Sequence, residues 1–295
     1  MARDGPGNVG THDSLSMRAV DLVLAVYNGA AAVAWTGALG RTAAAPWLVL
    51  VHATAMALPW VASRVGVGSP AWLRALREGY PLLLLYPFDA EVGMLHVAIG
   101  SPGHDAAVSA WDRSLFGAGW HRESYVLAPQ RWLSETMHAF YASYYVLLAG
   151  PPLAAAWVRN GAAFRDISLR QMLTYTACFA VYLFFPVFGP GHMDPFPLDG
   201  RPEGLFPDLV RGAIAGGDSP GTAFPSSHVA GSVTAAWLGR RWFPRPVAAL
   251  MTVGAIGVAL GTVYTRNHYA IDAAAGAALA ILLQTAVDRV GSRGR

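Results

Sequence analysis

The sequence predicts an all-α fold, a polytopic membrane bundle of about eight spanning helices. Hydrophobic residues make up 54% of the 295-residue chain and charged residues only 13%, whereas soluble domains carry about a quarter of their residues as charged side chains. The single cysteine, Cys178, cannot form an intrachain disulfide. This composition disfavours a disordered chain, a nucleic-acid-binding protein and a disulfide scaffold.

Eight apolar runs approach the length of about 20 residues that a helix needs to cross a bilayer core. They cover roughly residues 20–39, 45–63, 79–99, 136–158, 170–188, 225–242, 246–265 and 269–288. The third run is the least regular, and re-entry is the alternative to spanning, because it contains Pro81, Pro87, Asp89 and Glu91. We predict a cytoplasmic tail over residues 1–18 and a single membrane domain over residues 19–290.

The basic residues predict how the bundle is oriented. All 21 are arginine, and with the amino terminus inside, 14 fall in cytoplasmic segments and seven on the opposite side. Cytoplasmic loops are enriched in this way. Loss of the third span would invert the first two, so the bias also favours spanning. The Lys-free composition, rich in Ala, Gly and Arg, is typical of a GC-rich genome, so we expect a bacterial cytoplasmic membrane.

Two long connections are predicted on the outer side. Residues 100–135 contain several tryptophans, which suit an interfacial, partly helical segment. Residues 189–224 are rich in Gly, Pro and Asp without helical periodicity. We expect this second connection to be an irregular loop with a functional role, since such loops are uncommon in compact domains.

The motif TAFPSSHVAG (222–231) predicts an anion site at the start of a helix. Pro225 suits the helix start, and Ser226, Ser227 and His228 fall in the first turn. The unpaired N–H groups there and the helix dipole favour a bound anion. Two hydroxyls and an imidazole at that position would suit a phosphate.

The motif TVYTRNHYAIDAAAG (262–276) places His268 and Asp272 four residues apart, on one helix face. A carboxylate one turn from an imidazole can bond one ring nitrogen and leave the other as nucleophile or base. The predicted topology returns His268 to the face that holds His228. The segment GPGH (189–192) ends a span on the same face.

Together, FPSSHVA and NHYAID resemble the second and third signatures of the type 2 phosphatidic acid phosphatase (PAP2) superfamily. The HY-x-x-D form is closest to its Aur1-like branch, which includes inositol phosphorylceramide synthases, and WDRSLFG (111–117) and FYASYY (140–145) are also similar to that branch. The resemblance implies a six-helix catalytic core and phosphoryl transfer without a metal or other cofactor. It further implies that His268 forms a phosphohistidine, Asp272 orients it and His228 protonates the leaving oxygen.

The sequence departs from this pattern where a lysine is expected. The first signature needs a Lys seven residues before Arg-Pro, but Asp194 stands there before Arg201-Pro202. Gly261 and Thr262 replace the Ser-Arg of the third signature. A guanidinium can hold phosphate oxygens bidentately, so Arg266 and Arg201 are candidates to replace the lysine. We predict phosphate-binding roles for these two arginines and also for Ser226, Ser227 and His192.

The sequence therefore predicts a membrane lipid phosphatase or phosphotransferase that acts on a lipid phosphate or phospholipid at the outer membrane face. Transfer of a headgroup, as in an inositol phosphorylceramide synthase, is one alternative to hydrolysis, and a non-catalytic lipid-phosphate transporter is another. We expect the membrane and a lipid as partners, and no nucleic acid. The lipid, the acceptor and the oligomeric state stay open. The spacing of the aromatic run 140–145 fits helix packing, with a lipid-tail groove as the alternative.

Overall fold

The computed structural model describes residues 18–293 apart from 67, 118–129, 194–202 and 218. In these residues the chain is helical almost throughout, and its only β contact is an isolated bridge between Val187 and Thr222. The predicted all-α class is thereby confirmed. The predicted tail lies almost entirely outside the described residues, and the assignment of one domain stays a prediction.

The first three predicted spans correspond to five helices. They are α1 (Ala19–Thr36), α2 (Ala45–Ala55), α3 (Leu58–Ala62), α4 (Ala71–Leu83) and α5 (Leu85–Ile99). The second span is not one helix, because the chain turns before Pro59, which lies in the first turn of α3. The short break between α4 and α5 lies one turn before Pro87, which has no N–H to bond the carbonyl of Leu83.

The remaining predicted spans match longer helices. They are α8 (Arg131–Trp157), α9 (Gly161–Phe184), α12 (Ser227–Trp242), α13 (Arg245–Tyr264) and α14 (Ala270–Arg293). The predicted interfacial connection contains α6 (Asp105–Phe116). The expectation of an irregular loop over 189–224 is wrong in part, because it contains α10 (Pro190–Met193) and the 13-residue α11 (Leu205–Gly217). Glycines and a proline mask α11 in the sequence, but a proline fits its first turn.

Among the residues that the structure describes, four helical segments are long and apolar enough to cross a membrane: 19–36, 71–99, 245–264 and 270–292. The irregular third run lies within the second of these, so its interruptions do not prevent a continuous apolar segment. Helices α8, α9 and α12 coincide with predicted spans, but they are too short or not apolar enough to belong to this group. The apolar helices indicate an integral membrane protein.

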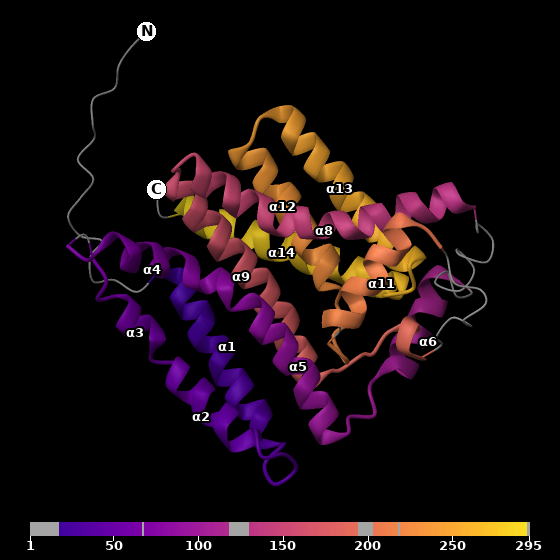
Figure 1. Ribbon diagram of the computed structural model, residues 1–295, viewed down its shortest axis with the longest axis horizontal. Helices are drawn as coiled ribbons and strands as arrows, with labels where there is room; N and C mark the ends of the chain where they lie inside the picture. Colours follow the sequence, from indigo (N-terminus) through magenta and orange to yellow (C-terminus); the bar gives the residue numbers. More distant parts are fainter. Residues whose placement is uncertain (1–17, 67, 118–129, 194–202, 218, 294–295) are drawn as a thin grey trace.

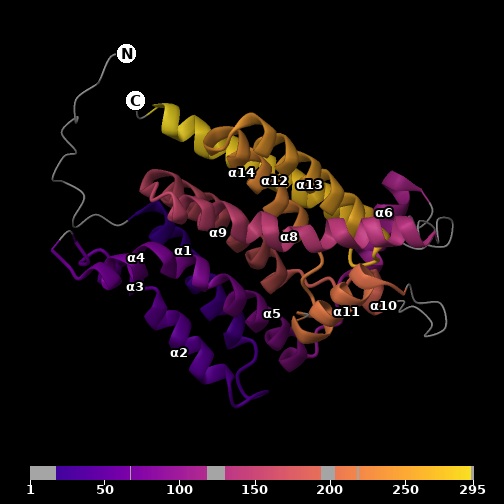
Figure 2. The ribbon, with the colours of Figure 1, turned by 45° about the horizontal axis from the view of Figure 1, so that its top comes forward.

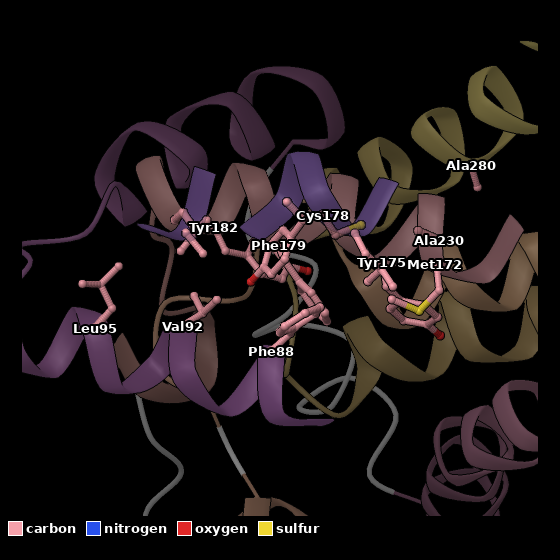
Figure 3. Packing of buried hydrophobic residues seen from close by; sticks show 14 of the residues in the cluster. Phe88, Val92, Leu95, Met172, Tyr175, Cys178, Phe179, Tyr182, Ala230 and Ala280 are labelled. Atoms are coloured by element: carbon pink, nitrogen blue, oxygen red, sulfur yellow. The ribbon is translucent and has the colours of Figure 1, made fainter. Parts of the chain in front are cut away.

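Helix α9 occupies the centre of the bundle. Helices α1, α4 and α5 pack on one side of it and α8, α12 and α14 on the other (Figures 1 and 2). Figure 3 shows Phe88 and Val92 of α5 facing Phe179 and Tyr182 of α9 in the main hydrophobic core. This packing connects the amino-terminal helices to the helices that carry the histidine motifs.

One end of α9, α12 and α14 is held by charged side chains, which we call the arginine clamp (Arg170, Asp166, Arg241 and Asp288). Arg170 of α9 is buried and bonds Asp166 at 2.9 Å and Asp288 of α14. Arg241 of α12 bonds Asp166 at 3.0 Å. The indole N–H of Trp237 donates to the other oxygen of Asp288 at 3.0 Å. The clamp joins three helices at the end of the bundle opposite the histidine motifs.

Candidate functional site

The two histidine motifs meet where α12 begins and where the α13–α14 connection enters α14. Ser226 caps α12, since its hydroxyl accepts the N–H of Val229 at 3.3 Å. The backbone N–H of Ser226 donates to the carbonyl of Asp272 at 2.9 Å. A Cβ on Gly276 would collide with the carbonyl oxygen of Ser226. Glycine at this position therefore permits the close contact between α14 and the start of α12.

The two imidazoles and two further side chains form a line of polar atoms, which we call the histidine relay (Tyr141, His228, His268 and Asp272). Nε2 of His268 lies 3.5 Å from Nδ1 of His228. Nδ1 of His268 lies 3.4 Å from Oδ2 of Asp272. At the other end, the hydroxyl of Tyr141 lies 3.2 Å from Nε2 of His228. The structure thus brings together His228, His268 and Asp272, and adds a tyrosine.

The acidic end of the relay is enclosed. Asp272 has no exposed surface, and the same Oδ2 that faces His268 accepts the backbone N–H of Tyr269 at 2.9 Å. His268 is 4% exposed. A carboxylate held in this way can fix the tautomer and the ring orientation of the imidazole beside it.

The sequence did not identify the aromatic wall around His228. The ring of Tyr144 lies 4.3 Å and that of Tyr141 5.1 Å from the His228 ring, between centroids. Both tyrosines belong to the run 140–145 on α8, and both line the same cavity as His228. Their spacing was the available signal, and it indicated a buried helix face without showing what that face contacts.

The residues predicted to bind phosphate lie in different surroundings. Ser226 uses its hydroxyl as the helix cap, while Ser227 lines the cavity beside His228. Arg266 is 5% exposed, with φ of 62°. His192 is exposed on the surface. Arg201 lies outside the described residues.

The GPGH segment packs against the chain just before His268. A Cβ on Gly189 would lie 2.9 Å from the carbonyl oxygen of Asn267, and one on Gly191 would lie 3.0 Å from that of Arg266. Gly189 also has φ of 86°, which favours glycine. The glycines therefore allow two backbone segments to touch, and they bring the loop that carries His192 to the loop that carries His268.

Two buried carboxylates of α6 hold both of these segments. Asp105 accepts the backbone N–H of Phe188 at 2.9 Å and of Gly189 at 2.8 Å. Two turns later, Asp112 accepts the N–H of Ile271 in the first turn of α14 at 2.9 Å. WDRSLFG resembled a family motif, but the partner of its aspartate lies 159 residues away along the chain. Local reasoning could not find that contact.

The two acidic residues of the third apolar run have different environments. Asp89 lines the cavity and accepts a hydrogen bond from Ser219 at 2.9 Å. Glu91 faces the other way and lies 2.8 Å from Nε2 of His52, whose Nδ1 lies 2.8 Å from the amide oxygen of Asn28. Glu91 therefore serves a hydrogen-bonded network between α1, α2 and α5, whereas Asp89 belongs to the cavity of His228.

Comparison with known proteins places the chain in a family. The family sequence model of the PAP2 superfamily matches residues 106–286. This match covers more than half of the chain and runs from α6 to α14. No curated protein matches the sequence. No solved structure matches it either. The chain is a membrane-embedded member of the PAP2 superfamily, and α1 to α5 lie outside the matched region.

Proposed function

We propose that the protein is a membrane enzyme that removes or transfers the phosphoryl group of a lipid phosphate or phospholipid at the outer membrane face. The observation that carries this proposal is the histidine relay at the start of α12, beside a cavity lined mainly by apolar residues. Phosphoryl transfer needs positioning and charge stabilisation more than any further covalent chemistry. Membership of the superfamily supports a phosphatase-type activity.

The proposed first half-reaction uses the relay in order. Nε2 of His268 attacks phosphorus, and the bond from phosphorus to the lipid oxygen breaks as the phosphorus–nitrogen bond forms. Asp272 accepts the N–H at Nδ1 of His268 and stabilises its positive charge. Protonated His228 gives its proton to the leaving oxygen. The helix dipole of α12 and the guanidinium of Arg266 favour the anionic phosphoryl group.

In the second half-reaction, neutral His228 takes a proton from water or from an acceptor hydroxyl as that oxygen attacks phosphorus. The phosphorus–nitrogen bond breaks and His268 is restored. Water gives inorganic phosphate, and an alcohol gives a new phosphoester, as in an inositol phosphorylceramide synthase. The relay serves both outcomes equally, so the acceptor that reaches it decides between them. No metal takes part in either step.

The test is turnover by the purified protein in detergent. Phosphatidic acid, prenyl diphosphates and inositol phospholipids are supplied with and without an acceptor alcohol, and free phosphate and new phospholipids are measured. We expect His268→Ala to abolish both products, and His104→Ala, outside the relay, to retain them. Full activity of His268→Ala would contradict the mechanism. Binding of lipid phosphate without turnover by the wild type would favour a transporter.

A further inference from the structure

The cavity beside His228 extends along two helices, α8 and α9. It has a volume of about 880 Å³. Its lining residues run from Tyr141 to Ala156 on α8 and from Phe179 back to Phe164 on α9. Because α8 and α9 are antiparallel neighbours, the two runs describe one elongated space. Ser227 and His228 lie at one end of this space and Phe164 at the other.

The helix geometry gives the length of this space. Fifteen residues separate the first and last lining residues on each helix, which corresponds to about 22 Å at 1.5 Å per residue. For comparison, one leaflet of a bilayer contributes about 15 Å of hydrocarbon, half of a core of about 30 Å. The space is therefore longer than one leaflet is thick. An extended chain advances about 1.2 Å per bond, so about 18 chain atoms would fill the space.

The lining changes from polar to apolar along this length. Asp89, Ser219, Thr222 and Ser227 line the part near His228. The rest is lined mainly by apolar residues, among them Leu82, Leu83, Leu148, Leu153, Ala156 and Phe164, although Gln171 is polar. A polar end next to a long apolar end is the pattern of a phospholipid, with its headgroup at the relay.

The space is also open towards the surroundings of the bundle. Leu83 is 68%, Tyr86 69% and Leu153 67% exposed, although all three line it. In a membrane these side chains face hydrocarbon, so a chain can enter sideways without crossing water. We call this space the chain groove, defined by its walls on α4, α5, α8, α9 and α11.

We propose that the chain groove binds one long hydrocarbon chain of the lipid phosphate, about 18 carbon atoms in length, while the phosphate occupies the relay. The inference rests on the proposed function and specifies its substrate class. One wall, from Gly79 to Asp89, belongs to α4 and α5, outside the region that matches the superfamily. The amino-terminal helices therefore set the preference for chain length.

Gly79 provides a variant that narrows the groove without disturbing the fold. A Cβ at Gly79 meets no atom within 4 Å, and the residue lies inside α4. Phenylalanine is a better helix former than glycine, so Gly79→Phe should fold and fill the apolar end. Gly291→Phe is the matched control, because Gly291 also has open space in a helix but does not line the groove.

The kinetic experiment measures kcat/KM for single-chain alkyl phosphates of about 8 to about 20 carbon atoms, a range that brackets the length derived above. We expect the wild type and Gly291→Phe to gain at least tenfold from the shortest chain to about 18 carbons. Gly79→Phe should lose that gain but stay within twofold of the wild type on the shortest chain. A flat profile in the wild type, or equal profiles for all three proteins, would overturn the inference.

A second measurement does not depend on turnover. An alkyl phosphate of about 18 carbons with a photoactivatable group at its chain end should label residues near Gly79, Leu153 or Phe164. Labelling confined to other segments would overturn the inference. Inactivity toward every alkyl phosphate, combined with the expected labelling, would count against the proposed function and leave the groove supported.

Discussion

The two ends of α9, α12 and α14 use polar side chains for opposite purposes. In the arginine clamp, Arg170 and Arg241 lie 2.9 and 3.0 Å from Asp166, and an indole N–H bonds the remaining aspartate. In the histidine relay, the contacts of His268 are 3.5 Å to His228 and 3.4 Å to Asp272. These clamp contacts fall within the usual range of hydrogen-bond lengths, whereas the two contacts of His268 are longer.

This difference indicates what each end does. Short, charge-assisted contacts between three helices fix their relative positions, whereas long contacts leave nitrogen lone pairs available to another atom. Catalytic hydrogen bonds are often long before substrate binds. We therefore expect substitutions in the clamp to lower stability and leave turnover nearly unchanged. Substitutions in the relay should lower turnover and leave stability nearly unchanged.

The largest expected effect is on turnover, from Asp272→Asn. The amide can still accept the N–H of Tyr269, but it cannot stabilise a positive charge on His268. We expect kcat to fall by about 10³- to 10⁴-fold, equivalent to about 4 to 5.5 kcal/mol in the barrier. Steady-state kcat and the Tm in detergent are measured together. A large fall in Tm with retained kcat would place Asp272 with the clamp instead.

Arg170→Leu should produce the next largest effect, and on stability. Removing one partner of a buried ion pair costs about 3 kcal/mol or more, and we expect the low end because the side chain of Asp288 is 36% exposed. Thermal unfolding in detergent should show a lower Tm, while turnover per folded molecule stays within twofold. Arg240→Leu, at an exposed arginine in the last turn of α12, is the control and should leave Tm unchanged.

Asp112 tests whether a residue outside the relay can act through it. Asp112→Ala leaves the partly buried N–H of Ile271 without its acceptor, which costs up to about 2 kcal/mol. If α14 shifts, kcat should fall about tenfold or more with KM nearly constant. Asp112→Asn keeps an acceptor oxygen and should restore most of kcat. Equal loss in both variants would show that the negative charge matters rather than the position of α14.

The smallest expected effect is from Tyr141→Phe, which removes only the hydroxyl facing His228. One neutral hydrogen bond contributes about 1 kcal/mol, so we expect kcat to fall about fivefold with an unchanged Tm. Tyr145→Phe is the control, because Tyr145 lines the same groove but is 50% exposed. A loss of Tm in Tyr141→Phe without a loss of kcat would indicate packing alone.

Much of this molecule follows from local patterns in the sequence. Apolar runs of the length of a bilayer determined where the helices lie, to within a few residues for α1, α12, α13 and α14. The i, i+4 spacing of His268 and Asp272, and the topology of the spans between them and His228, predicted that the three side chains meet. Such features depend on neighbours in the chain or on the direction of successive helices, so the sequence by itself can determine them.

Only the tertiary structure decided which distant residues complete the site. Tyr141 lies 87 residues from His228 and Asp112 lies 159 from Ile271. Whether Asp89 faces the groove and Glu91 a separate network depends on how α5 rotates against α1 and α9. Helix α11 was missed because its glycines lower the helical signal, while Glu135 of α8 bonds its first N–H groups at 2.9 and 3.0 Å. The physical reason is the same throughout: periodicity identifies a buried face, but packing between helices selects the partner of that face.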